Sequence, residues 1–127
     1  MKQLNHSEVF LKKALEDEIL LKKLINDFDV SDTIWGFHAQ QAIEKLLKAL
    51  LIKNKTDFPR THDLTVLFEL LNGAGVELPF SINDLDILTP YAVLLRYEDF
   101  EGENIDRETV FKFIQKVRQW AEKLIRE

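Results

Sequence analysis

The 127-residue chain contains no cysteine, and only four glycines and three prolines interrupt it. Without cysteine there are no disulfides, no thiolate metal ligands and no cysteine nucleophile. No apolar run approaches the ~20 residues that a membrane-spanning helix needs, and the segment 1–10 lacks the apolar core of a signal peptide. We therefore expect a cytoplasmic protein with no membrane contact.

Motifs for bound metals and cofactors are also missing. The sequence has no P-loop, no G-x-G-x-x-G, no G-x-S-x-G and no calcium loop, and no two histidines have metal-ligand spacing on one helix. We expect neither a metal nor a cofactor. The net charge of −5 argues against general binding to DNA, although it leaves room for a local basic patch.

The apolar residues that are present follow helical spacing in three long and two shorter segments, and strand-like alternation is absent. The segment 33–53 is the most apolar, and nine of its side chains fall on one arc of roughly 200°: Trp35, Ala39, Ala42, Ile43, Leu46, Leu47, Ala49, Leu50 and Leu51. Such a helix must pack against several neighbours. The sequence predicts one domain over residues 1–127, an all-α, up-and-down helical bundle of four to five helices.

Capping residues locate the first two helices. The first is expected to start near Ser7 and to run for about six turns. Ser31 or Asp32 is expected to cap the second, which should end near Asn54. Gly36 lies inside that second helix, and the close approach of another helix would explain it.

The later helices have similar signals. Thr61 or Asp63 is expected to cap a short third helix, and Asp106 to cap the last one. The segment 85–97 also has helical spacing, and Pro90 either kinks that helix or starts a new one.

One group of candidate site residues lies on the second helix. His38, Gln41, Lys45 and Lys48 are spaced i, i+3, i+7 and i+10 and therefore share a face. Together they can hold a phosphate or a nucleotide. The alternative is a solvated face on which Glu44 and Lys48 form an ordinary ion pair.

A second group follows Pro59 and consists of Arg60, His62 and Asp63. A loop on a rigid scaffold can present a histidine and an arginine to a ligand. Alternatively, His62 and Asp63 cap the next helix and Arg60 pairs with an acid.

The third group is Tyr91, Arg96 and Tyr97, followed by an acidic run over 98–103. An aromatic ring beside an arginine suits stacking on a base. Alternatively, Arg96 interacts with the end of its own helix.

Three blocks in this order, FHAQQAIEKLLKALL, FPRTHDL and LTPYAVLLRY, resemble the HEPN domain family. The resemblance implies a small α-helical bundle, commonly a homodimer. It also implies a minimal nucleotidyltransferase partner in a toxin–antitoxin-like pair, and binding of a nucleotide or RNA. Several branches of the family are metal-independent ribonucleases.

The residues that match the three blocks are those of the three groups above. By this resemblance the nucleotide- or phosphate-binding candidates are Gln41, Lys45, Lys48, Arg60, His62, Asp63, Tyr91, Arg96 and Tyr97. Glu98 stands where the family often has a proline after the R-Y pair.

The ribonuclease branches carry an arginine on the late helix and, separated from it by four to six residues, a histidine. No histidine follows His62 here, so Arg96 and Arg107 lack that partner. Catalytic residues are therefore unassigned, with His38 and His62 as the candidates for an acid–base group.

The leading interpretation is a binding module for a nucleotide, RNA or a nucleotidyltransferase partner rather than an enzyme. A metal-independent ribonuclease is the alternative, and a purely structural dimeric docking protein is a second one. A homodimer is also expected, because an arc as wide as that of 33–53 can remain partly exposed beside four short neighbours. The alternative is that the first and last helices cover the arc completely.

Overall fold

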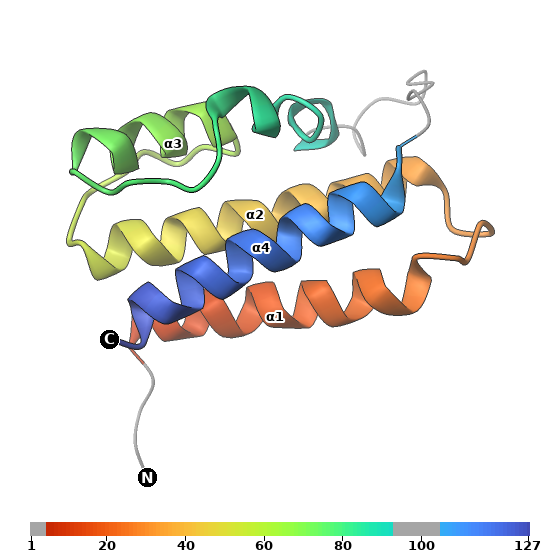
Figure 1. Ribbon diagram of the computed structural model, residues 1–127, viewed down its shortest axis with the longest axis horizontal. Coiled ribbons are helices and arrows are strands. Elements are labelled where there is room, and N and C mark those ends of the chain that lie inside the picture. Colours follow the sequence, from red (N-terminus) through yellow and green to blue (C-terminus); the bar gives the residue numbers. More distant parts are fainter. Residues whose placement is uncertain (1–4, 93–104) are drawn as a thin grey trace, which may run out of the picture.

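The computed structural model describes residues 5–92 and 105–127. Within these residues there are four α-helices and two short 3₁₀-helices and no strand, which confirms the predicted all-α helical bundle (Figure 1). The elements are α1 (His6–Leu24), α2 (Asp32–Lys53), α3 (Leu64–Gly73), η1 (Ile82–Leu85), η2 (Thr89–Ala92) and α4 (Arg107–Ile125). None of the described helices is both long and apolar enough to cross a bilayer.

The three long helices lie side by side, with α1 antiparallel to α2 and α4 running in the same direction as α2 (Figure 1). Contacts at both ends fix this parallel pair. Arg107 at the start of α4 binds Asp32 at the start of α2, and the Lys53 ammonium at the end of α2 donates to the Glu127 carbonyl at 3.3 Å. Helix α3 covers another side of α2, and η1 and η2 return the chain toward the start of α4.

Two of the predicted caps are confirmed by their hydrogen bonds. The Ser31 hydroxyl accepts from the Ile34 amide at 3.2 Å at the start of α2. The Asp63 carboxylate accepts from the Thr65 amide at 2.9 Å at the start of α3. Local sequence alone therefore determines where these helices begin.

Asp106 caps α4 as predicted. Its carboxylate accepts from the Thr109 amide at 3.2 Å and from the Thr109 hydroxyl at 2.9 Å. These bonds favour the charged form and lower the pKa of Asp106 below its ordinary value. The cap therefore stabilises the fold at pH values above the ordinary pKa of aspartate. This contribution is lost as the pH falls through the lowered pKa of Asp106.

The first helix differs from expectation at its start. Asn5, not Ser7, is the N-cap, and its side chain accepts from the Glu8 amide at 2.9 Å. The helix has 19 residues, which is about five turns instead of the predicted six. The Ser7 hydroxyl instead donates to the Asn5 side chain.

The apolar arc of α2 is covered completely within one chain. All nine of its predicted apolar residues are at most 1% exposed, because α1, α3, α4 and η2 pack around the helix. Of the two alternatives, complete coverage of the arc within one chain is therefore confirmed, although α3 and η2 take part in it besides the first and last helices. The homodimer stays a prediction, but it no longer has this support.

The segment 85–97 is not one α-helix over the part that is described. Two 3₁₀-helices joined by a turn occupy 82–92, and Pro90 is the second residue of η2. Pro90 therefore lies in the first turn of a new short helix, at its second position and not at the first, where a restarted helix with Thr89 as its cap would place it. Residues 93–97 lie outside the described part.

Gly36 has the role that the sequence suggested, because another helix approaches it closely. A Cβ atom at this position would lie 2.5–2.8 Å from three ring atoms of Tyr91, which belongs to η2. The missing side chain therefore lets the tyrosine ring lie directly on α2.

Arg107 joins α4 to the corner between α1 and α2. Its guanidinium donates to the carbonyls of Leu24, Asp27 and Val30 and to the carboxylate of Asp32, at 2.6–3.1 Å. The carbonyls of Leu24 and Asp27 each also accept a backbone amide, from Asp27 and Val30, so Arg107 adds a second hydrogen bond to them. One buried side chain thus connects α4 to three carbonyls and one carboxylate of the helix–helix corner.

The Gly36 contact leads to a prediction with a matched control. In an ordinary helix, glycine to alanine stabilises by up to ~1 kcal/mol, but Gly36→Ala also forces the Tyr91 ring to move. Since overpacking costs about 1–3 kcal/mol, we expect a net loss of about 1 kcal/mol, or about 4 °C in Tm.

The control is Gly73→Ala at the end of α3, where a Cβ meets nothing within 4 Å. Thermal unfolding followed by circular dichroism should show an unchanged or higher Tm for this variant. A higher Tm for Gly36→Ala would contradict the packing described here.

Candidate functional site

A row of polar residues on α2 faces the loop that leads into α3. Gln40, Glu44 and Lys48 are spaced four residues apart, so they form one ridge of the helix. The Glu44 side chain is only 5% exposed. Its Oε1 accepts from the Gln40 amide at 3.1 Å, and its Oε2 accepts from the Lys48 ammonium at 3.1 Å.

His62 adds the third contact to this carboxylate from the loop. Its Nδ1 lies 2.9 Å from Glu44 Oε1, and the Gln40 amide donates to the His62 carbonyl at 3.0 Å. An ionised carboxylate only accepts, so a neutral His62 carries its proton on Nδ1. Its lone pair is then on Nε2, and the side chain is 55% exposed.

The environment of Glu44 explains why a carboxylate is tolerated here. Burying a charge is costly unless it is paired and hydrogen-bonded, and three donors converge on this one. No buried side-chain nitrogen or oxygen among the described residues lacks a partner. Lys48 also lies over the Phe58 ring, 5.9 Å from its centre. Both the lysine and the histidine are thus held in place by the same buried group.

The surface beside this buried group carries two of the candidate side chains. The His62 imidazole can exchange a proton through Nε2 or donate a hydrogen bond to an anion when protonated. Arg60 is exposed and forms no ion pair or hydrogen bond within the described part of the chain. A cation and an imidazole two residues apart are therefore available for a phosphate.

The four predicted residues on α2 do not form one group. Lys45 turns toward α1, where its ammonium donates to Asp17 at 2.7 Å, and His38 Nδ1 lies 3.9 Å from the same carboxylate. Lys48 turns the other way, toward Glu44. The alternative of a Glu44–Lys48 ion pair is confirmed, although this pair is buried and not solvated.

Gln41 lies between these two directions, and its amide donates to the Gln40 side-chain oxygen at 2.9 Å. Each lysine of the predicted phosphate clasp already has a carboxylate partner. Their charges are therefore largely neutralised within the protein, which weakens them as phosphate ligands.

The residues of the second and third candidate groups also have different roles in the structure. Asp63 caps α3, the simpler of its two roles, whereas His62 binds Glu44 and lies beside the polar row of α2. Tyr91 is a core residue with only 5% of its surface exposed, so it presents no open face for base stacking. Arg96 and Tyr97 lie outside the described residues.

Sequence reasoning missed Glu44 and Gln40 as members of the site. Glu44 was considered only as a surface partner of Lys48, and Gln40 was not considered. The signal that was available is their four-residue spacing with Lys48, which places all three on one ridge. The loop partner, His62, lies 18 residues from Glu44 and could not be matched to it by helical spacing.

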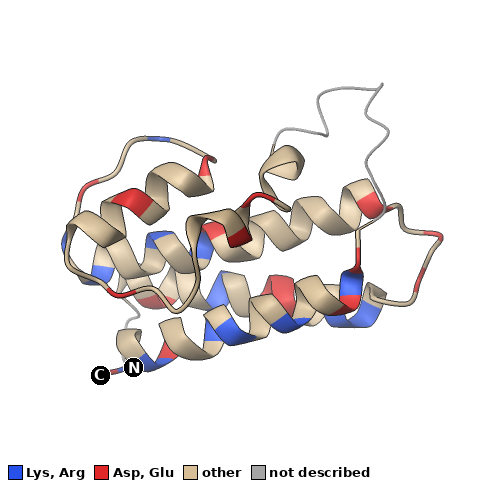
Figure 2. Cartoon of the chain, turned by 45° about the horizontal axis from the view of Figure 1, so that its top comes forward, with Lys and Arg blue, Asp and Glu red and all other residues tan. Residues whose placement is uncertain are grey.

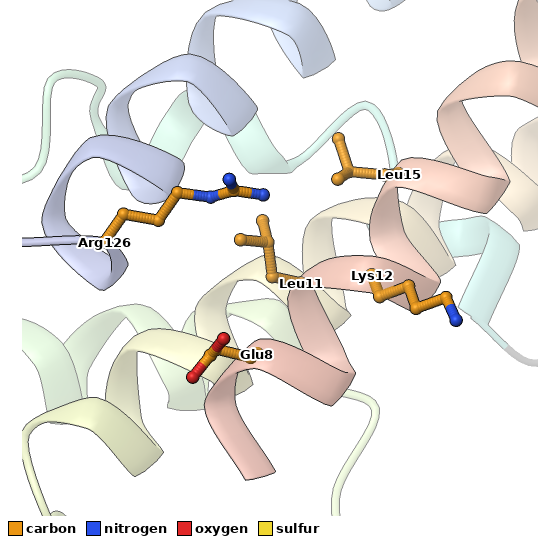
Figure 3. A pocket seen from close by; sticks show the side chains of 5 residues that line it. All are labelled: Glu8, Leu11, Lys12, Leu15 and Arg126. Carbon is orange, nitrogen blue, oxygen red and sulfur yellow. The ribbon is translucent and has the colours of Figure 1, made fainter. Parts of the chain in front are cut away.

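Two hollows lie elsewhere on the bundle. A cavity of about 160 Å³ between the ends of α1 and α4 has Leu11 and Leu15 on its walls (Figure 3). This is below the ~300 Å³ at which ligand pockets begin.

A larger hollow of about 530 Å³ lies at the end of α2. Trp120 lines it, but Glu77 and Glu127 share its rim with Lys53, so its charge opposes a phosphate. None of the predicted site residues lines either hollow.

The buried network predicts the effect of removing the Glu44 charge. Glu44→Gln leaves the Lys48 ammonium without its counter-ion and His62 without a carboxylate, so it should cost about 2–4 kcal/mol of unfolding free energy. Adding Lys48→Met removes the unpaired charge and should recover part of that loss. Urea unfolding at pH 7 measures both.

Glu16→Gln, an exposed change of the same kind on α1, is the control and should stay within about 0.5 kcal/mol of the parent. Strictly additive effects of Glu44→Gln and Lys48→Met would show that the two residues do not act as a pair.

Comparison with known proteins agrees with this architecture. No curated protein and no solved structure matches the chain. The family model described as HEPN domain matches residues 7–124, which include all four α-helices except the first residue of α1 and the last of α4. The chain therefore belongs to the HEPN domain family.

Proposed function

We propose that this HEPN domain is a nucleotide- or RNA-associated binding module that works with a minimal nucleotidyltransferase partner in a toxin–antitoxin-like pair. The observation that carries the ligand part is the loop pair Arg60 and His62, with His62 held by the buried Glu44 carboxylate at 2.9 Å. Family membership supports the partner part.

The loop is a better phosphate contact than the α2 lysines on electrostatic grounds. Lys45 and Lys48 each have a carboxylate within 3.1 Å, and a phosphate would compete with it. Arg60 has no acidic partner among the described residues, and its guanidinium can bind a phosphate with two parallel hydrogen bonds. The protein's net charge of −5 favours such a local contact over general attraction of polyanions.

A thermal-shift panel with ATP, GTP and other mononucleotides tests this site. A ligand at 100 times its dissociation constant stabilises the native state by about 2.7 kcal/mol, and we expect a rise of several degrees in Tm that Arg60→Glu abolishes. Lys23→Glu, an exposed charge reversal on α1, is the matched control and should retain the shift.

An unchanged shift in Arg60→Glu would remove the loop from the site. A panel in which no nucleotide raises the Tm would contradict nucleotide binding. The proposal would then reduce to the partner protein, with the polar row of α2 and its loop as the docking surface.

A metal-independent ribonuclease is the second candidate, and the Glu44–His62 contact favours it. A carboxylate that holds Nδ1–H leaves Nε2 to accept the proton of a ribose 2′-hydroxyl. The 2′-oxygen then attacks the adjacent phosphorus, the bond to the 5′-oxygen breaks, and that oxygen takes a proton. Arg60 would stabilise the charge that builds on the phosphoryl oxygens.

This candidate predicts that the purified protein cuts single-stranded RNA in the presence of EDTA. His62→Ala should abolish the cutting, whereas His38→Ala, whose imidazole lies near Asp17 on the other side of α2, should retain it. Intact RNA after incubation with the wild-type protein would rule out the enzyme without touching the binding proposal.

A further inference from the structure

Charge is distributed unevenly along the fold. Over residues 64–92 there is no lysine or arginine, and the four acids in this segment, Glu69, Glu77, Asp84 and Asp86, are all exposed. Helix α4 has the opposite balance, with five cations and two acids between Arg107 and Ile125. Figure 2 shows basic residues recurring along α4, which ends near the C-terminus, although the protein as a whole is acidic.

Three of the α4 cations form an exposed line, which we call the α4 lysine row: Lys112, Lys116 and Lys123. They occupy positions i, i+4 and i+11, and exposed Gln119 continues the line at i+7. These positions fall within a narrow arc of the helix. The row therefore lies along one outer edge of the bundle.

Helix α4 carries two acids, Glu108 and Glu122, and Glu108 precedes Lys112 by one turn. Glu122 is engaged with Arg118 and Arg126 at 3.9 and 3.7 Å, and Arg118 is in turn held by Glu18 at 3.0 Å. That bond raises the pKa of Arg118. No lysine of the row forms a salt bridge within the described residues, although Lys112 helps to lower the pKa of Asp106.

The lysines of the row are spaced along the helix so that one extended polyanion can contact all three. With a rise of 1.5 Å per residue, its lysines are about 6 and 10 Å apart along the helix axis. A chain of phosphates can neutralise such a line, because its charges recur at short and regular intervals.

The row suits a membrane poorly. A helix that lies on a lipid surface inserts an exposed apolar face, but the apolar face of α4 is buried in the core. Val110, Ile114, Val117 and Ala121 are at most 2% exposed. The exposed edge of α4 can therefore contact charged groups, but it has no apolar face to insert into a lipid surface.

We propose that the α4 lysine row is a contact surface for the phosphate backbone of single-stranded RNA. The proposal rests on the proposed function in that it takes RNA as the ligand, but it concerns a surface that is separate from Arg60 and His62. A strand held at α4 is bound without regard to sequence, since phosphate contacts carry no base information.

The test is the salt dependence of binding to a fluorescently labelled twelve-residue oligouridylate, measured by anisotropy from low to moderate salt. The variant is the triple change Lys112→Gln, Lys116→Gln, Lys123→Gln, in which glutamine keeps nearly the same helix propensity. Each phosphate contact on a single strand contributes ~0.7 to the slope of log K against log salt. The triple variant should therefore lower the magnitude of that slope by about 2.

The matched control changes three exposed lysines of α1, Lys12→Gln, Lys13→Gln and Lys23→Gln, with the same loss of net charge. Its slope should stay close to that of the wild type, and circular dichroism should show both variants folded. Equal slopes for the α4 variant and the wild type overturn the proposal, as does an equal loss in the two triple variants.

Two further outcomes separate this proposal from the proposed function. No binding of the oligouridylate by the wild type overturns the α4 surface, while the mononucleotide thermal shift still decides the Arg60 site. Row-dependent binding of phosphatidylserine vesicles or of polyglutamate as tight as that of the oligouridylate also overturns it, because the row would then not select a nucleic-acid strand.

Discussion

The burial of α2 is the constraint on which the rest of the structure depends. A helix that is apolar over so wide an arc has to be covered on most sides, and α1, α3, α4 and η2 share that task. Only two lines along it remain for polar groups. One meets Asp17 on α1, and the other meets His62 on the loop before α3. Both lines are made of charges that are paired because burial would otherwise penalise them.

The site follows from this arrangement more than from any motif. Glu44 is held by a residue one turn before it and a residue one turn after it, so its position is a property of α2 itself. The loop then docks on a carboxylate that is already fixed. A histidine placed in this way combines a rigid support with an accessible ring nitrogen, which is the combination that both ligand binding and proton transfer need.

Three of the four caps of the described α-helices, which neighbouring residues set, could be predicted from the sequence, whereas the pairing of polar side chains across distant segments could not. The caps at Ser31, Asp63 and Asp106 depend on amides two or three residues away, so their hydrogen bonds could be expected from the residue type. The division of the α2 polar face could not, because Asp17 lies 28 residues from Lys45. For the same reason, the sequence left open whether the apolar arc of α2 is covered within one chain. The spacing of apolar residues in α2 does not indicate how much of its surface the Tyr91 ring and η2 cover.

Arg107 has a structural role in this fold. It lies on the last helix, where ribonuclease branches of the family carry a functional arginine, yet here it is 5% exposed and all its described bonds are to the corner of α1 and α2. Its partners lie 75–83 residues away in the chain. The hairpin of α1 and α2 is close in sequence and pairs two of its corner carbonyls locally, but the guanidinium that also binds this corner comes from α4. Part of the stability of the first hairpin therefore depends on the end of the chain, which couples the two halves in folding.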